Sequence, residues 1–187
     1  MNIAIPAAPT AAQQAAKNNR CKLRGVERDK FCNHYNPVVA TANAMRIVLY
    51  VVKDRIIIPT VARAGAGFRE VEPVASLRLG DPNLPQVLEE ALRRGNPHVE
   101  SPSRMNFPEA VVVKYAGAES WPAFVKIAER WEFVAEDGTY TLAHGTKDSK
   151  GNYWGGKNKL MIPRDASGTL PDTIAIVDAI RSDAKAR

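Results

Sequence analysis

The chain of 187 residues is poor in the residue types that most often carry out chemistry. It has two cysteines and three histidines, and aromatic residues make up 7% of it. Cys21 and Cys32 lie close together and cannot form the disulfide framework of a small secreted protein. With His34 they still lack the tight C-x-x-C pair of a structural zinc site, so we expect neither a metal nor a cofactor.

Long apolar runs are also missing. A transmembrane helix needs roughly 18 or more consecutive apolar residues, and no stretch of this sequence approaches that length. A secretory signal has a basic start followed by an apolar core, whereas here alanines alternate with Pro, Thr and Gln and the first lysine is Lys17. We therefore expect a cytoplasmic protein.

The net charge of +6 is unevenly spread along the chain. Residues 1–44 hold six lysines and arginines against two acids, whereas acids and bases are interspersed over residues 45–187. The first 44 residues also contain few large apolar side chains that could hold them against a core. They predict a flexible basic N-terminal arm, followed by one α+β domain over residues 45–187.

The domain alternates between apolar runs with strand character and amphipathic stretches. We expect strands over 47–52, 56–61, 69–77, 111–113, 132–135, 140–143 and 153–162. Pro73 favours an edge position for the third of these strands. Helices are expected over 84–94, after an N-cap at Ser120, and over 170–182 with Thr169 as its cap. The Ser120 helix carries a face expected to be core, made of Trp121, Phe124, Val125, Ala128 and Trp131.

Two parts of the domain follow a similar pattern. Residues 47–94 and 132–182 each contain a hairpin, a third strand and a segment with a Leu-Pro pair, at Leu84-Pro85 and Leu170-Pro171. This indicates two β-β-β-α units joined by a central strand and helix, although two short meanders can also match by chance. The fold expected is a single compact α+β domain, with a mostly antiparallel sheet and about three helices.

The connection over residues 95–108 contains three prolines and has no regular period. A serine, a histidine and a glutamate within seven residues invite comparison with a hydrolase triad, but no nucleophile turn such as G-x-S-x-G is present. We therefore predict no catalytic residue. Loops of this length are often functional, so we interpret it as a recognition loop with His98, Glu100 and Arg104 as binding residues.

The second candidate surface is the segment from Lys147 to Lys159. Its lysines flank two aromatic residues, which is typical of surfaces where rings stack on bases while ammonium groups meet phosphates. A lysine-rich hairpin also commonly protects an exposed sheet edge. The candidate binding residues of this segment are Lys147, Lys150, Tyr153, Trp154 and Lys157.

Two functional hypotheses follow, and catalysis is less favoured than either. The first is a non-catalytic, bacterial-type cytoplasmic protein that acts by protein–protein contact, as an inhibitor or immunity-type protein. The alternative is a nucleic-acid-binding protein that uses residues 17–30 and 147–159. Ionic strength separates them, because binding through phosphates weakens steeply as salt rises.

Removal of the basic arm tests the domain boundary. Deletion of residues 1–44 is expected to leave the thermal unfolding midpoint nearly unchanged, because this segment contributes few large apolar side chains to a core. Circular dichroism melts of the full chain and the deletion variant measure the difference. A large drop in the midpoint would show that the arm is part of the core.

Overall fold

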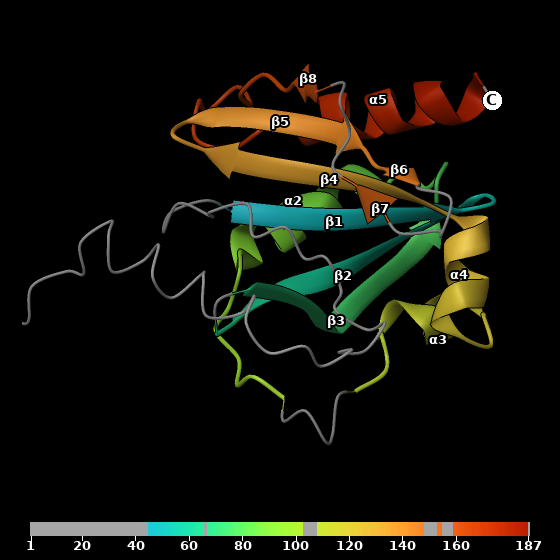
Figure 1. The fold of residues 1–187 in the computed structure, drawn as a ribbon. Helices are drawn as coiled ribbons and strands as arrows, with labels where there is room; N and C mark the ends of the chain where they lie inside the picture. The colour runs from blue at the N-terminus through green and yellow to red at the C-terminus, as the bar shows by residue number, and fades with distance from the viewer. Residues whose placement is uncertain (1–44, 66, 103–107, 148–152, 155–158, 187) are drawn as a thin grey trace, which may run out of the picture. The chain divides into compact units, whose positions relative to one another are not determined.

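The computed structural model describes residues 45–186, apart from Ala66 and residues 103–107, 148–152 and 155–158. Six antiparallel strands form one sheet in the order β3-β2-β1-β4-β5-β8 (Figure 1). A two-stranded hairpin, β6 (Thr146–Lys147) with β7 (Tyr153–Trp154), forms a second small sheet. The strands of the main sheet are β1 (Met45–Val52), β2 (Arg55–Ala64), β3 (Gly67–Arg78), β4 (Ala128–Glu136), β5 (Thr139–His144) and β8 (Lys159–Met161).

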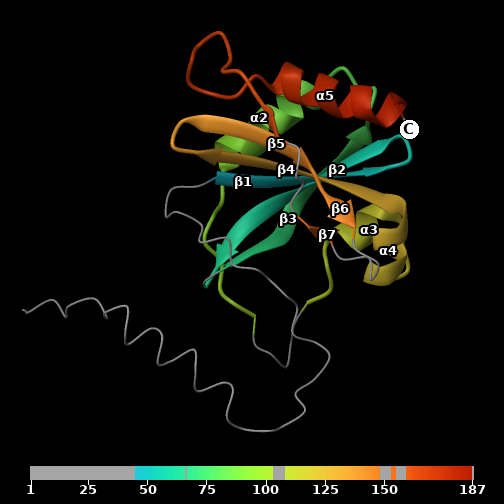
Figure 2. The same ribbon diagram turned by 45° about the horizontal axis from the view of Figure 1, so that its top comes forward.

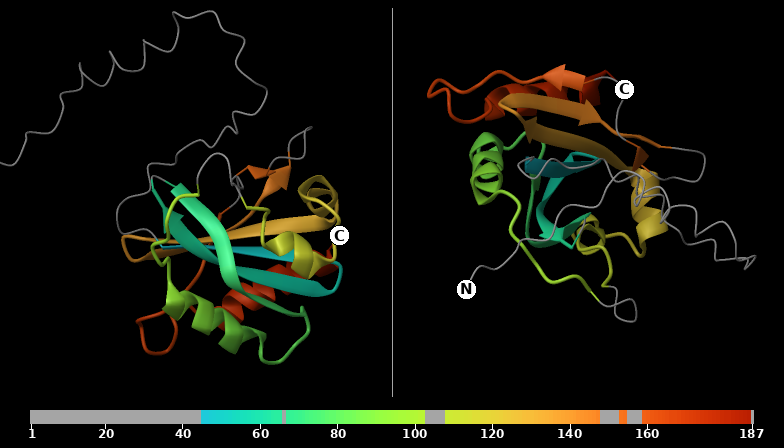
Figure 3. Two further views of the ribbon diagram at one scale, coloured as in Figure 1. Left: turned by 90° about the horizontal axis from the view of Figure 1, so that it is seen from below. Right: turned by 60° about the vertical axis from the view of Figure 1, so that its left-hand side comes forward.

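Four helices complete the described fold, and they divide between the two faces of the sheet. Helices α2 (Leu84–Arg94) and α5 (Thr173–Lys185) pack on one face, whereas α3 (Val112–Ala116) and α4 (Trp121–Ile127) pack on the other. Figures 2 and 3 show α2 and α5 side by side, apart from the yellow α3 and α4. The expected α+β class with an antiparallel sheet is confirmed, and no helix in the described part of the chain is long and apolar enough to cross a membrane.

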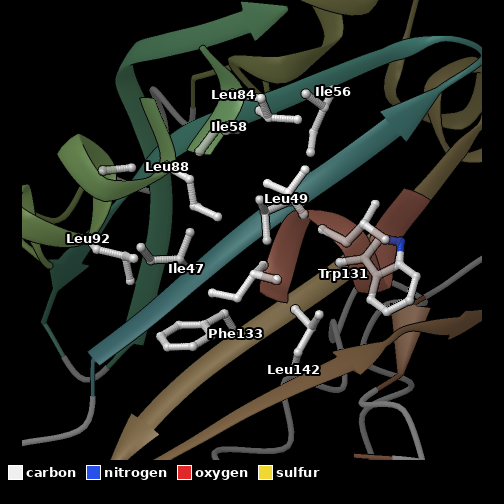
Figure 4. Close-up of a cluster of buried hydrophobic side chains, with 14 of the residues drawn as sticks. Ile47, Leu49, Ile56, Ile58, Leu84, Leu88, Leu92, Trp131, Phe133 and Leu142 are labelled. Atoms are coloured by element: carbon white, nitrogen blue, oxygen red, sulfur yellow. The ribbon is translucent and has the colours of Figure 1, made fainter. Parts of the chain in front are cut away.

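The larger core lies between the sheet and the α2–α5 layer (Figure 4). Alternate residues of a strand face opposite sides, so Ile47 and Leu49 enter this core while Val48 and Tyr50 enter the smaller core under α3 and α4. This explains why β1 is a continuous apolar run. The side chains drawn in Figure 4 include Ile47, Leu49, Ile56, Ile58, Leu84, Leu88, Leu92, Trp131, Phe133 and Leu142.

The two similar sequence segments occupy equivalent places in the sheet. Strands β1 and β4 pair in antiparallel fashion at the centre, β2 and β5 flank them, and β3 and β8 lie at the edges, the position that Pro73 predicts for β3. In both central hairpins a two-residue turn opens with a residue of positive φ, Lys53 at 57° and Asp137 at 49°. The topology is that of two halves related by an approximate two-fold axis between β1 and β4.

The segment that joins the halves differs from the prediction. Val111 to Val113 were expected to form a strand, but α3 covers Val112–Ala116 and ends at Gly117, whose φ of 66° is typical of a helix C-terminus. Val112 and Val113 are buried against the second face of the sheet. Tertiary packing has therefore overridden the β preference of branched side chains.

The expected aromatic helix face is correct only in part. Ser120 caps α4 and accepts a hydrogen bond from the Ala123 backbone N–H at 3.4 Å, and Phe124 is buried as predicted. The helix ends at Ile127, however, so Trp131 lies in β4, where it is buried. Trp121 is 40% exposed, and its assignment to the core was wrong. Likewise α5 is capped by Asp172 and not by Thr169.

The loop after α2 fills a split in the sheet. Strands β1 and β2 pair only near their turn, over Tyr50–Val52 and Arg55–Ile57. Where they separate, the Asn96 side chain bridges them: its Oδ1 accepts from the Arg46 N–H at 2.8 Å, and its Nδ2 donates to the carbonyls of Arg46 and Val61, each at 2.7 Å. The side-chain amide thus makes hydrogen bonds to backbone groups that β1 and β2 do not make with each other at this point.

Substitution of Asn96 tests this bridge. Asn96→Ala is expected to lower the free energy of unfolding by about 1–3 kcal/mol, because three backbone groups lose their partners at a half-buried site. Urea unfolding measures the change. Asn83→Ala is the control, since the Asn83 side chain makes no capping hydrogen bond at α2, and it should change stability by less than about 0.5 kcal/mol. Equal effects of the two substitutions would contradict the bridging role.

Candidate functional site

The second face of the sheet carries a group of charged and polar side chains on its central strands. Arg46 and Tyr50 lie on this face of β1, and the register sets Tyr50 opposite Arg130 and Val48 opposite Glu132 in β4. Glu70 reaches the same place from β3, because it pairs with Val61 of the second core. We call these residues the sheet-face cluster: Arg46, Tyr50, Glu70, Arg130 and Glu132.

Glu132 is the centre of the ion pairs in the cluster. One carboxylate oxygen meets Arg46 Nε, and the other accepts from Arg130 Nη1 at 3.2 Å. The three side chains keep only 12% to 21% of their surface exposed. Removing charges from water to this extent costs several kcal/mol per ion, so each charge depends on its partners.

The second carboxylate of the cluster is held by a phenol. Tyr50 is buried, and its hydroxyl donates to Glu70 Oε1 at 2.6 Å. Burial raises the pKa of the Glu70 carboxyl, although the Tyr50 hydrogen bond and the charges of Arg130 and Arg46 act to lower it. Burial and the nearby Glu70 charge raise the pKa of Tyr50 well above its usual value, so this residue stays a neutral donor.

Aromatic rings surround the charged groups. The guanidinium groups of Arg46 and Arg63 lie 5.8 and 5.2 Å from the centre of the Phe68 ring, which is cation–π distance. Tyr153 of β7 meets Tyr50 edge-on at 6.1 Å and donates from its hydroxyl to the Ala128 carbonyl at 2.5 Å. The hairpin β6–β7 is thereby attached beside the sheet-face cluster.

The predicted recognition loop lies along β2. The backbones of Arg63 and His98 form a parallel bridge, in which the Arg63 N–H donates to the Pro97 carbonyl at 2.8 Å and the Val99 N–H donates to the Arg63 carbonyl at 2.9 Å. His98 and Glu100 are both exposed. Arg104 lies outside the described residues, so its role stays a prediction, as do the roles of the other two.

The predicted aromatic–lysine surface is partly engaged within the chain. Lys147 Nζ donates to Glu129 Oε1 at 3.3 Å and lies 5.5 Å from the centre of the Tyr153 ring. Trp154 pairs through its backbone with Thr146. The structure therefore brings two of the predicted residues, Lys147 and Tyr153, together beside β4. The predicted residue His98 lies elsewhere, because its backbone pairs with Arg63 of β2. Two others, Lys150 and Lys157, lie outside the described residues.

None of the predicted binding residues belongs to the sheet-face cluster. A sequence signal for it did exist: Arg46 and Tyr50, like Arg130 and Glu132, occur at even spacing and so share one face of a strand. The signal was hidden because residues 128–131 were assigned to a helix. Among the described residues no group of three or more His, Cys, Asp or Glu side chains could hold a metal ion, and Cys21, Cys32 and His34 lie outside that part.

No protein-family model matches the chain, and no curated protein sequence matches it. Similar solved structures include a chain of the CdiA-CT/CdiI toxin and immunity complex from Yersinia pseudotuberculosis, with a TM-score of 0.50 and 11% identity over 74% of this chain and 97% of that one. Another is the Protein of Unknown Function NMB0488 from Neisseria meningitidis, with a TM-score of 0.47 and 12% identity over 64% of this chain and 84% of that one. At such identities the first likeness shows a shared fold alone.

The buried carboxyl predicts a pH dependence of stability. Because the pKa of Glu70 is raised in the folded state, this residue contributes to the free energy of unfolding at low pH. The contribution is fully present below the ordinary glutamate pKa of 4.5 and is lost as pH rises through the folded pKa. In Glu70→Gln this contribution is absent while an acceptor for Tyr50 remains. The free energy of unfolding should therefore fall less steeply above pH 4.5 in the variant than in the wild type.

Urea unfolding at a series of pH values from 4.5 upward measures this difference. Glu100→Gln, on the exposed loop, is the control and should keep the wild-type profile. If Glu70→Gln and the wild type have parallel profiles, the Glu70 carboxyl is not desolvated in the folded protein.

Proposed function

We propose that this chain is a non-catalytic cytoplasmic binding protein that acts by protein–protein contact, as an immunity-type inhibitor. The observation that carries the proposal is the sheet-face cluster. A sheet face covered by apolar side chains is usually as stable as one that holds a buried ion network, or more so. Charges retained at such a place are therefore candidates for recognition of another molecule.

The composition of the cluster supports binding to a protein surface. Arginine is among the residue types that contribute most to binding energy at protein interfaces, where it becomes desolvated on contact. Arg46 and Arg130 keep part of their side-chain surface exposed and are held in place by Glu132, whereas Tyr50 is buried and acts through its hydrogen bond to Glu70. A chain of a toxin and immunity complex shares the fold, which agrees with the proposal.

The same contacts give less support to catalysis. A general base needs a carboxylate that can reach a substrate proton. Glu132 is engaged by two arginines and Glu70 by the Tyr50 hydroxyl, so each carboxylate already has its partner. For the nucleic-acid alternative, Lys147 and Tyr153 would first have to leave their contacts with Glu129 and Ala128.

Capture from native lysate tests the proposal with a matched pair of variants. Full-length protein is used as bait at moderate salt, and the eluate is analysed by mass spectrometry and by absorbance at nucleic-acid wavelengths. Arg46→Met removes a cluster charge and keeps the apolar stem, while Arg93→Met removes an arginine that pairs with Glu89 on the exposed face of α2. Circular dichroism melts of both variants check that they fold.

We expect one stoichiometric protein partner that survives a high-salt wash with the wild type and with Arg93→Met. Arg46→Met should bind it at least tenfold more weakly, a typical effect of truncating a central interface arginine. Expressed alone, the partner should arrest growth, and co-expression of this chain should restore it. Recovery of nucleic acid that the high-salt wash removes, with no protein partner, would replace the proposal by the alternative.

A further inference from the structure

A basic hollow lies at the end of the sheet that holds the β1–β2 turn. Its volume is about 870 Å³, within the range of binding pockets in proteins. Three separate segments meet there: the β1–β2 turn, the connection from β3 to α2, and the last turns of α5. Figures 1 and 2 show the C-terminal end of α5 beside the β1–β2 turn. The charged lining residues are Lys53, Asp54, Arg78, Asp81, Arg181 and Lys185.

The wall of the hollow is held together by hydrogen bonds to backbone carbonyls. The Leu79 N–H donates to the Asp54 carbonyl at 2.6 Å, which ties the β3–α2 connection to the β1–β2 turn. Arg181 of α5 donates from Nε to the Leu79 carbonyl at 2.8 Å and from Nη2 to the Asp81 carbonyl at 3.2 Å. The three segments therefore form one braced unit, and the hollow exists before any ligand binds.

The side chains of the remaining cations around the hollow have no acidic partner among the described residues. Lys53, Arg78 and Lys185 are exposed, and none of their side chains forms a hydrogen bond or an ion pair with another described residue. Two other exposed cations, Lys114 and Arg93, are paired with Glu72 and Glu89. Lys53, Arg78, Arg181 and Lys185 outnumber Asp54 and Asp81 in the lining. An excess of positive charge around a concave surface attracts an anionic ligand.

We propose that this basic hollow binds an acidic peptide segment of the partner protein. The proposal rests on the proposed function and adds a chemical description of the partner. Carboxylates on the segment would meet Lys53, Arg78 and Lys185. Its backbone N–H groups can donate to Asp54 and Asp81, which also line the hollow.

The same two aspartates make nucleic acid a poorer occupant. A phosphate backbone carries negative charge at every nucleotide and has no backbone donor to offer the carboxylates. None of the described residues in the lining has an aromatic ring on which a base could stack, and such rings are the usual feature of single-strand binding sites. A peptide with spaced acids fits the charges of the hollow better.

Binding of a labelled 20-residue polyglutamate peptide to the full-length chain tests this inference by fluorescence anisotropy. The hollow variant is Lys53→Gln/Arg78→Gln/Lys185→Gln. The control variant, Arg93→Gln/Lys126→Gln/Lys159→Gln, removes three exposed cations that do not line the hollow and so changes the net charge equally. A single-stranded DNA oligonucleotide of the same length is measured in parallel.

We expect the hollow variant to bind the peptide at least tenfold more weakly than the wild type, and the control variant to differ by less than threefold. Equal weakening by both variants, or no binding to the wild type, would overturn the inference. DNA binding that is tighter than peptide binding and is lost in the hollow variant would assign the hollow to phosphate. If the protein captured from lysate binds the hollow variant normally, the proposed function stands and the inference fails.

Discussion

The carboxylate of Glu132 is the constraint on which the second face of the sheet depends. It lies opposite Val48 at the centre of the β1–β4 pair, where a lone negative charge could not be tolerated away from water. Arg46 and Arg130 neutralise it. Burial opposes the charged form of Arg130, but the charges of Glu132 and Glu70 raise the pKa of this guanidinium above its usual value. The charge of this one acid is thus balanced by one arginine on β1 and one on β4.

The two faces of the sheet therefore serve different purposes. The face under α2 and α5 is apolar from β2 to β5 and supplies most of the buried surface that holds the domain together. This leaves the opposite face freer to hold charge, since α3 and α4 cover its apolar part with Val113 and Phe124. The apolar core on the first face supplies enough stability for the second face to hold an ion network that contributes little to it.

Much of the fold could be predicted from the sequence, because its hairpins and α2 have clear periods and turn signals. The prediction failed where tertiary contacts outweigh local preference, as at Val112, whose branched side chain packs in a helix. The site was missed for a related reason: once Trp131 was placed on a helix, Arg130 and Glu132 no longer shared a face. The role of Asn96 has no local signal, since it depends on a separation of two strands that only the assembled sheet reveals.

The approximate two-fold arrangement has a consequence for how the chain folds. Strands β1 to β3 and strands β4 to β5 can each form through local hairpins, but the seam between the halves joins Met45 to Ala135. Such distant pairings form slowly, because a long loop must close before any contact compensates for it. Until β4 has been synthesised, the edge of β1 that pairs with it has no partner within the described strands, and exposed strand edges of this kind favour aggregation.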